Sequence, residues 1–271
     1  MNLQLKKFDM RMIPPASTCM IVAKRGQGKS TLIKDLMYYK QDIPVGTVIS
    51  ATEPSNCFFE KFVPRMFIHF KYDTVIIQNF LKRQKKLKKR IKRGEHLDNR
   101  AYLIFDDMMY DQSWKKDQEM REIFFNSRHF ETLFVCALQD PMGIPPNFRG
   151  NIDFVFLLKE NNRTNKEKLW KHYAAVFPTY EMFSETLDQC TNNRECLVIN
   201  NTANAGRLEE QVFWYKAELH NDFRVGPEEI WNISEQNYMD DDDDDEEINI
   251  NTYNAAASSK RKGPHIKVKK V

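Results

Sequence analysis

A glycine-containing loop between a strand-like and a helix-like segment sharply restricts the possible folds of this chain. Its sequence is Ala23-Lys24-Arg25-Gly26-Gln27-Gly28-Lys29-Ser30. The apolar run Met20-Ile21-Val22 precedes the loop, and Thr31-Leu32-Ile33 follows it as a helix start. Such a loop turns backbone N–H groups toward phosphates, its lysine reaches the β and γ phosphates, and its serine hydroxyl binds Mg²⁺. We therefore predict that residues 25–31 bind ATP, with Ser30 as a ligand of Mg²⁺.

One position departs from the usual pattern, because Ala23 stands where such loops commonly have their first glycine. A residue with a side chain must keep a negative φ at this position or tolerate strain. The alternative interpretation is a chance Gly-Lys-Ser on the protein surface. The strand-like run before the loop and the helix-like run after it favour a phosphate site.

Two further strand ends carry the polar groups that ATP hydrolysis needs. Asp106 and Asp107 follow the apolar run Tyr102–Phe105, and Gln139 follows the run Thr132–Leu138. Ligands of open α/β sheets bind at the carboxyl ends of the strands. Hydrolysis requires an acid that holds Mg²⁺ through water and a group that orients the attacking water, roles that we assign to Asp106 and Asp107. Gln139 is placed to sense the γ phosphate or to position water, although a glutamine at a strand end is otherwise unremarkable.

Apolar runs of strand length alternate with helix-like segments, which predicts an α/β fold with a mostly parallel central sheet flanked by helices. Most of the strand candidates are continuously apolar, as in a sheet that helices cover on both faces. The strand candidates are Cys19–Ala23, Thr47–Ala51, Phe67–Phe70, Tyr102–Phe105, Thr132–Leu138, Asp153–Leu158, Cys196–Asn200 and Val212–Ala217. The helix candidates are Lys29–Tyr39, Val75–Arg93, Gln118–His129, Thr164–Val176 and Thr179–Cys190, with Gly94 as the C-cap of the second.

The composition divides the chain into residues 1–239, a P-loop ATPase domain, and residues 240–271, a disordered acidic-then-basic tail. Eight consecutive acids, Asp240 to Glu247, lie within a chain whose formal net charge is +3, so the remainder is basic. A basic body points weakly to nucleic acid. The acidic run either competes with DNA for the basic surface or serves only solubility.

Neither the cysteines nor the hydropathy indicate a secreted or membrane protein. The five cysteines form no Cys-x-x-Cys pair, which argues against a disulfide framework or a structural zinc site. No stretch reaches the roughly 20 apolar residues that a membrane helix needs. We expect no membrane span.

The second predicted helix is strongly basic. Residues 82–93 carry nine positive charges, while Ile77, Phe80, Leu81, Leu87 and Ile91 recur at helical spacing. One face is therefore expected to pack against the body and the rest to be cationic. This helix either follows a DNA phosphate backbone or is an ordinary solvated lysine face.

The ordered set of motifs resembles the genome-packaging ATPases of large eukaryotic DNA viruses, the poxvirus-type members of the FtsK/HerA lineage. The similarity covers about Ile13 to Leu158, with a later match at Val212–Ala217. The matching motifs are Lys24 to Ser30, Ile104 to Asp107, Ser127-Arg128-His129, Gln139, and Ile144 to Arg149 before Ile152-Asp153.

The resemblance implies a RecA-like core that forms a homo-oligomeric ring and pumps double-stranded DNA into a capsid, in contact with portal or vertex proteins. It also implies that Asp107 is the catalytic carboxylate and Gln139 the sensor. Arg128 and Arg149 are both candidates for the arginine that reaches a neighbouring subunit's nucleotide. The expected location is the host cytoplasm or a viral factory, with the virion or the nucleus as alternatives.

Two other functional classes stay open on the residues alone. A P-loop nucleotide kinase shares the loop, but it needs an arginine-rich lid that Arg163 to Lys168 supplies poorly. A DNA-binding scaffold with a structural nucleotide site is the second alternative, and the intact Lys29, Ser30, Asp106 and Asp107 argue against it. A GTPase is less favoured, because no Asn-Lys-x-Asp motif follows a strand.

Overall fold

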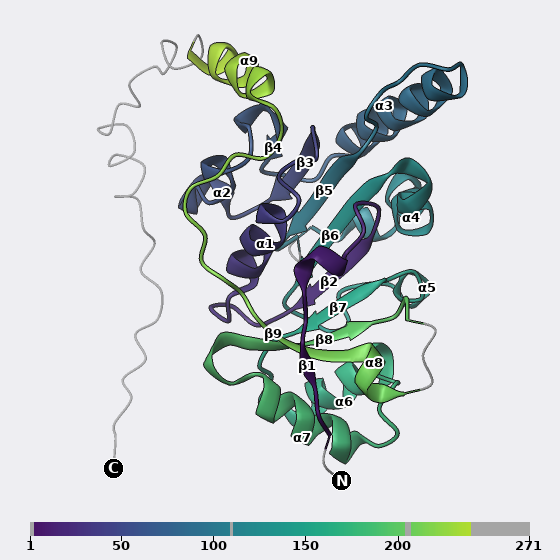
Figure 1. Cartoon of the computed structure of the whole chain (residues 1–271), viewed down its shortest axis with the longest axis vertical. Coiled ribbons are helices and arrows are strands. Elements are labelled where there is room, and N and C mark those ends of the chain that lie inside the picture. The colour runs from purple at the N-terminus through teal and green to yellow at the C-terminus, as the bar shows by residue number, and fades with distance from the viewer. Residues whose placement is uncertain (1–2, 109–110, 204–206, 240–271) are drawn as a thin grey trace, which may run out of the picture.

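The computed structural model of the protein, which describes residues 3–108, 111–203 and 207–239, contains a nine-stranded sheet with helices on both faces (Figure 1). The strand order is β1-β9-β8-β7-β2-β6-β5-β3-β4. The strands are β1 Lys6–Lys7, β2 Thr18–Val22, β3 Gly46–Ser50, β4 Ile68–His69, β5 Ala101–Asp106, β6 Thr132–Leu138, β7 Phe154–Leu157, β8 Glu195–Asn200 and β9 Val212–Lys216. The α-helices are α1 Lys29–Tyr38, α2 Glu53–Asn56, α3 Thr74–Lys92, α4 Gln118–Asn126, α5 Pro146–Arg149, α6 Arg163–Tyr173, α7 Tyr180–Cys190, α8 Leu208–Gln211 and α9 Glu228–Met239.

The sheet is mostly parallel, as predicted, and among the described residues its antiparallel pairs are those of β8. That strand pairs antiparallel with both β7 and β9. The strands that carry the predicted site, β2, β5 and β6, are parallel to one another, and β6 lies between the other two. Their carboxyl ends therefore meet at one edge of the sheet.

Two apolar cores explain why the strands read as continuous apolar runs. In β2, Met20 packs in the core that contains Trp114 and Phe124, whereas Ile21 packs in the core that contains Leu32. Helices α3, α4, α6 and α7 contribute to the first core and α1 to the second. Successive strand residues alternate between faces, so both sets of side chains must be apolar.

Every predicted strand and helix is present, with ends shifted by a few residues. The helix predicted as Val75–Arg93 begins at Thr74 after an N-cap, Asp73, whose carboxylate accepts the Val75 N–H, and Gly94 follows its end with φ +93°. The strand β1 and the helices α2, α5, α8 and α9 were not predicted. The proposed tail, residues 240–271, lies outside the described residues. No helix in the described ranges is both long and apolar enough to cross a membrane.

Candidate nucleotide site

The phosphate loop joins β2 to α1 with the backbone geometry that its sequence indicates. Gly28 is the N-cap of α1 and has φ +100°, and Gly26 has φ +78°. Both values lie in the region that favours glycine. Ala23 has no positive φ, which is the first of the two alternatives that its sequence left open, and its N–H donates to the Leu138 carbonyl at 3.0 Å. The loop is thus fixed to the end of β6, and the N–H groups at the start of α1 face the carboxyl edge of the sheet.

The two predicted acids and Gln139 meet the loop at that edge. Gln139 Nε2 donates to Asp107 Oδ1 at 2.5 Å. Lys29 Nζ lies 3.9 Å from the same oxygen, and the lysine side chain is only 9% exposed. Asp107 has a left-handed backbone, φ +54°, directly after β5. A non-glycine residue in this conformation is uncommon and is often found at functional sites.

A cleft of about 570 Å³ unites these groups, a size that suits a nucleotide. Its walls are Lys24, Arg25, Gly26, Gly28, Lys29, Ser30, Thr31, Thr52, Ser55, Asn56, Asp106, Asp107, Gln139 and Arg194. All of the predicted nucleotide and metal residues except Gln27 line this cleft. Arg128 and Arg149 do not.

Asp106 is buried at the base of the cleft with an unsatisfied oxygen. The residue is 4% exposed, and its Oδ1 has no hydrogen-bond partner among the described residues. Burial raises the pKa of the carboxyl to about 6, Lys29 opposes this rise, and Asp107 and Glu53 add to it. A buried carboxylate oxygen without a partner, in a cleft that Ser30 also lines, fits the hard oxygen ligands that Mg²⁺ prefers.

Four lining residues outside the motifs were missed by sequence reasoning. Thr52, Ser55 and Asn56 follow β3, the neighbour of β5, and enter the cleft from the segment that contains α2. These three residues could have been predicted to line the site, because they follow a predicted strand of the parallel sheet and ligands bind at the carboxyl ends of such strands. Arg194 comes from the turn between α7 and β8. No sequence signal identified it, because its placement depends on the antiparallel course of β8.

The two candidate arginines are held by other partners. Arg128 forms an ion pair with Asp153, which is 5% exposed and also accepts the Thr18 N–H at 2.8 Å. These groups lie at the amino ends of β2 and β7, the edge opposite the phosphate loop. Arg149 donates to the Ile144 carbonyl at 2.8 Å from Nη2 and at 3.2 Å from Nε.

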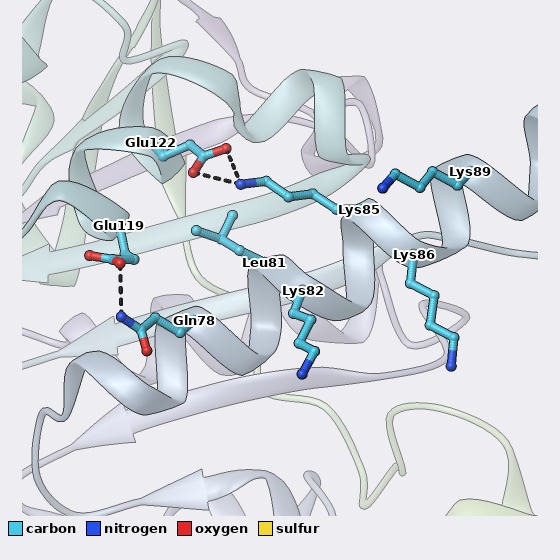
Figure 2. Close-up of a pocket in the computed structure, with 8 residues that line it drawn as sticks. All are labelled: Gln78, Leu81, Lys82, Lys85, Lys86, Lys89, Glu119 and Glu122. Atoms are coloured by element: carbon cyan, nitrogen blue, oxygen red, sulfur yellow. Dashed lines mark hydrogen bonds and ion pairs between the residues drawn. The ribbon is translucent and has the colours of Figure 1, made fainter.

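The basic helix α3 packs through one face and exposes most of its lysines. Ile77, Phe80, Leu81 and Gln84 are its buried residues, whereas Leu87 and Ile91, predicted to pack, are only half-buried. A groove of about 490 Å³ separates α3 from α4, and Lys85 reaches across it to Glu122 at 2.7 Å (Figure 2). Figure 2 shows Lys82 and Lys86 directed away from α4.

Sequence comparisons place the chain among proteins of large DNA viruses. No protein-family model matches it. Uncharacterized protein L437 of Acanthamoeba polyphaga mimivirus is 36% identical over 240 residues, which cover 87% of this chain and 84% of the relative. Uncharacterized protein 075L of Invertebrate iridescent virus 6 is 35% identical over 249 residues, 86% of this chain and 94% of the relative.

Structural comparisons identify the fold. The genome packaging NTPase B204 from Sulfolobus turreted icosahedral virus 2, in complex with sulfate, matches with a TM-score of 0.56 at 14% identity, over 77% of this chain and 100% of that one. EssC (ATPases 2 and 3) from Geobacillus thermodenitrificans matches with a TM-score of 0.51 at 10% identity, over 82% and 43%. The chain has the fold of the P-loop ATPases.

Proposed function

We propose that this chain, which belongs to the same family as protein L437 of mimivirus and protein 075L of Invertebrate iridescent virus 6, is an ATP-driven double-stranded DNA translocase. In this proposal the protein is of the poxvirus-type packaging class and moves a viral genome into a capsid. The structural likeness to the genome packaging NTPase B204 supports this class of machine.

The observation that carries the proposal is the convergence of Lys29 with the Asp107–Gln139 pair in one cleft. Lys29 would bind the β and γ phosphates, and Asp107 would orient the attacking water and accept its proton. Gln139, bonded to the same carboxylate oxygen, would hold that water or sense the γ phosphate. The water oxygen bonds to the γ phosphorus as the bridging bond breaks, and ADP and phosphate leave.

Ser30 and Asp106 are the residues that would hold Mg²⁺. The ion supplies positive charge against the charge that develops on the phosphates. Burial raises the pKa of Asp106 to about 6, and a divalent cation bound at this carboxylate would lower that pKa.

The surface proposed for DNA is the exposed side of α3. Lys82, Lys86 and Lys89 are exposed, and none of them has an ion-pair partner among the described residues. Contacts between such lysines and phosphates release counterions, so binding is insensitive to base sequence and weakens with salt.

Replacing these three lysines by glutamine is expected to weaken duplex binding equally for unrelated sequences and to flatten its salt dependence. Basal ATP hydrolysis should persist, because α3 contributes no residue to the nucleotide cleft. Lys85→Gln is the matched control, since the Lys85 ammonium is already paired with Glu122. An unchanged salt slope in the triple variant would assign α3 to an ordinary solvated face.

A ring is part of the proposal, because the arginine that completes the site would come from a neighbouring subunit. Mixing an Arg128→Ala or Arg149→Ala variant with Lys29→Ala is then expected to restore part of the activity at hybrid interfaces. A monomeric enzyme cannot regain turnover in this way. If neither mixture recovers activity where oligomers form, the arginine acts within one chain or not at all.

ATP hydrolysis with and without linear duplex DNA tests the proposal against its alternatives. A translocase should hydrolyse ATP faster when DNA is present. A P-loop nucleotide kinase should not respond to DNA and should transfer phosphate to a nucleoside monophosphate, and a scaffold should be inactive in both conditions.

The proposal also includes contacts with capsid portal or vertex proteins. The proposed location is the host cytoplasm or a viral factory, with the virion or the nucleus as alternatives.

A further inference from the structure

Arg194 enters the nucleotide cleft from outside the phosphate-binding motifs. It ends the short 3-10 helix Asn192–Arg194, between α7 and β8, and the residue lines the cleft. The residue is exposed and forms no hydrogen bond or ion pair with the described residues. Its guanidinium is therefore available to a ligand in the cleft.

The backbone at this turn is held in an unfavourable conformation. Asn193 has φ +54° and Arg194 has φ +62°, so two successive residues other than glycine are left-handed. Asparagine adopts this region more readily than most residues, but arginine does not. Such outliers persist where the surrounding structure imposes them and cluster at ligand sites. Here the strained backbone presents a cationic side chain to the cleft.

Strand order defines which end of a nucleotide Arg194 faces. Asp107 and Gln139 follow β5 and β6, on one side of the phosphate-loop strand β2, whereas Arg194 precedes β8, on the other side. The lysine that binds β and γ phosphates, Lys29, lies beside Asp107. The γ phosphate therefore occupies the β5–β6 side, and the nucleoside leaves the loop toward β7 and β8.

Two further cations of the loop, Lys24 and Arg25, also line the cleft, and Lys24 is already paired. Lys24 Nζ lies 2.6 Å from Glu160 Oε1, and Glu160 is 6% exposed. Arg25 belongs to the phosphate loop itself, whereas Arg194 is a guanidinium that the β8 side contributes from outside the loop. Its planar group has the geometry to stack on an aromatic ring.

We propose that Arg194 binds the base of the nucleotide by stacking its guanidinium on the purine ring. The inference rests on the proposed nucleotide site and adds a residue for recognition of the nucleoside. Cation–π stacking of this kind predicts that loss of the side chain weakens the binding of ATP and ADP alike, by about 2- to 30-fold. Inorganic tripolyphosphate, which has no base, should bind unchanged.

The experiment measures ATP, ADP and tripolyphosphate binding by calorimetry, and thermal unfolding, for the full chain and three variants. Arg194→Ala removes the guanidinium but keeps the backbone strain, because alanine, like arginine, is unfavourable in the left-handed region. Arg194→Gly removes the side chain and relieves the backbone, so its unfolding temperature should equal or exceed that of Arg194→Ala. Asn193→Gly is the control, because it relieves the backbone and leaves the guanidinium in place, and it should bind all three ligands like the original protein.

Equal loss of ATP and ADP affinity in both Arg194 variants, with tripolyphosphate unaffected, supports the inference. Loss of tripolyphosphate affinity to the same degree would show a phosphate contact and overturn it, as would unchanged ATP and ADP affinity. If the unmodified protein binds neither ATP nor tripolyphosphate, the proposed function fails and this inference fails with it. If the unmodified protein, Arg194→Ala and Arg194→Gly all bind ATP and ADP equally well, the role of Arg194 is overturned and the proposed function is not affected.

Discussion

Asp106→Asn should stabilise the protein at neutral pH when nucleotide and Mg²⁺ are absent. Burial raises the pKa of the Asp106 carboxyl from its ordinary 3.8 to about 6, with Lys29 lowering it and with Asp107 and Glu53 adding to the rise. Between these pH values the unfolded chain loses the proton and the folded chain keeps it. The free energy of unfolding therefore falls as the pH rises through this window, and above it the full penalty, about 3 kcal/mol, is present.

Asparagine has nearly the same shape and no charge, so it removes this penalty. The gain in free energy of unfolding is expected to be about 3 kcal/mol at pH 7.5 and about half of that at pH 5. Urea denaturation of both proteins at both pH values, in EDTA, measures it. An asparagine amide without an acceptor would change both values by the same amount, so the difference between the two pH values is the decisive quantity.

Ligand binding supplies the second arm of this test. ATP with Mg²⁺ should stabilise the original protein, because a cation beside Asp106 compensates its charge, and should stabilise Asp106→Asn much less. A variant whose stability relative to the original is the same at pH 5 and pH 7.5 would refute the electrostatic reasoning. Equal stabilisation of both proteins by ATP with Mg²⁺ would refute the assignment of Asp106 as a metal ligand.

Two further predictions concern the phosphate site and the sheet beneath it. Lys29→Ala should abolish both ATP binding and hydrolysis, whereas Asp107→Asn should retain ATP binding and lower the hydrolysis rate by about 10²–10⁴-fold; equal loss of affinity in both would contradict the assigned roles. Gly46→Ala should lower the free energy of unfolding by about 1–3 kcal/mol or more, because its Cβ would lie 2.1 Å from the fully buried ring of Tyr102. Gly150→Ala is its control, since nothing lies within 4 Å of that Cβ, and equal denaturation midpoints for the two variants would argue against the clash.

The strands that carry the site could be predicted because their signal is local. Residues of β2, β5 and β6 are buried on both faces, so each strand is a continuous apolar run followed by polar groups. The two-residue strand β1 has no such signal. Lys6 and Lys7 are exposed, and only their pairing with Phe213 and Trp214 of β9 makes them a strand.

The helix α9 was missed for a related reason. It contains buried Trp231 and Ser234 among many polar residues, so its amphipathic pattern is weak. Its start is stabilised by the rest of the molecule. Arg224 stacks on the Trp231 ring at 4.5 Å, and the Trp231 indole donates to the Val225 carbonyl at 3.0 Å.

The arginine pair illustrates most clearly what the motifs leave undetermined, since the cost of releasing each side chain depends on packing. Withdrawing Arg128, whose side chain is 63% exposed, would leave the Asp153 carboxylate, 5% exposed, with the Thr18 N–H as a partner but without a compensating charge. The partners of Arg149 are all neutral. It donates from two nitrogens to the Ile144 carbonyl and from Nη2 to Met142 Sδ at 3.8 Å, and its guanidinium lies 5.7 Å from the centre of the Tyr173 ring. Neutral hydrogen bonds contribute about 1 kcal/mol each. Releasing Arg149 leaves no buried charge without compensation, so a neighbour's nucleotide has to offset less to attract Arg149 than to attract Arg128. For the proposed ring, this difference favours Arg149 as the arginine that would act between subunits. Arg128 instead pairs with Asp153, which also accepts the Thr18 N–H at the start of the phosphate-loop strand.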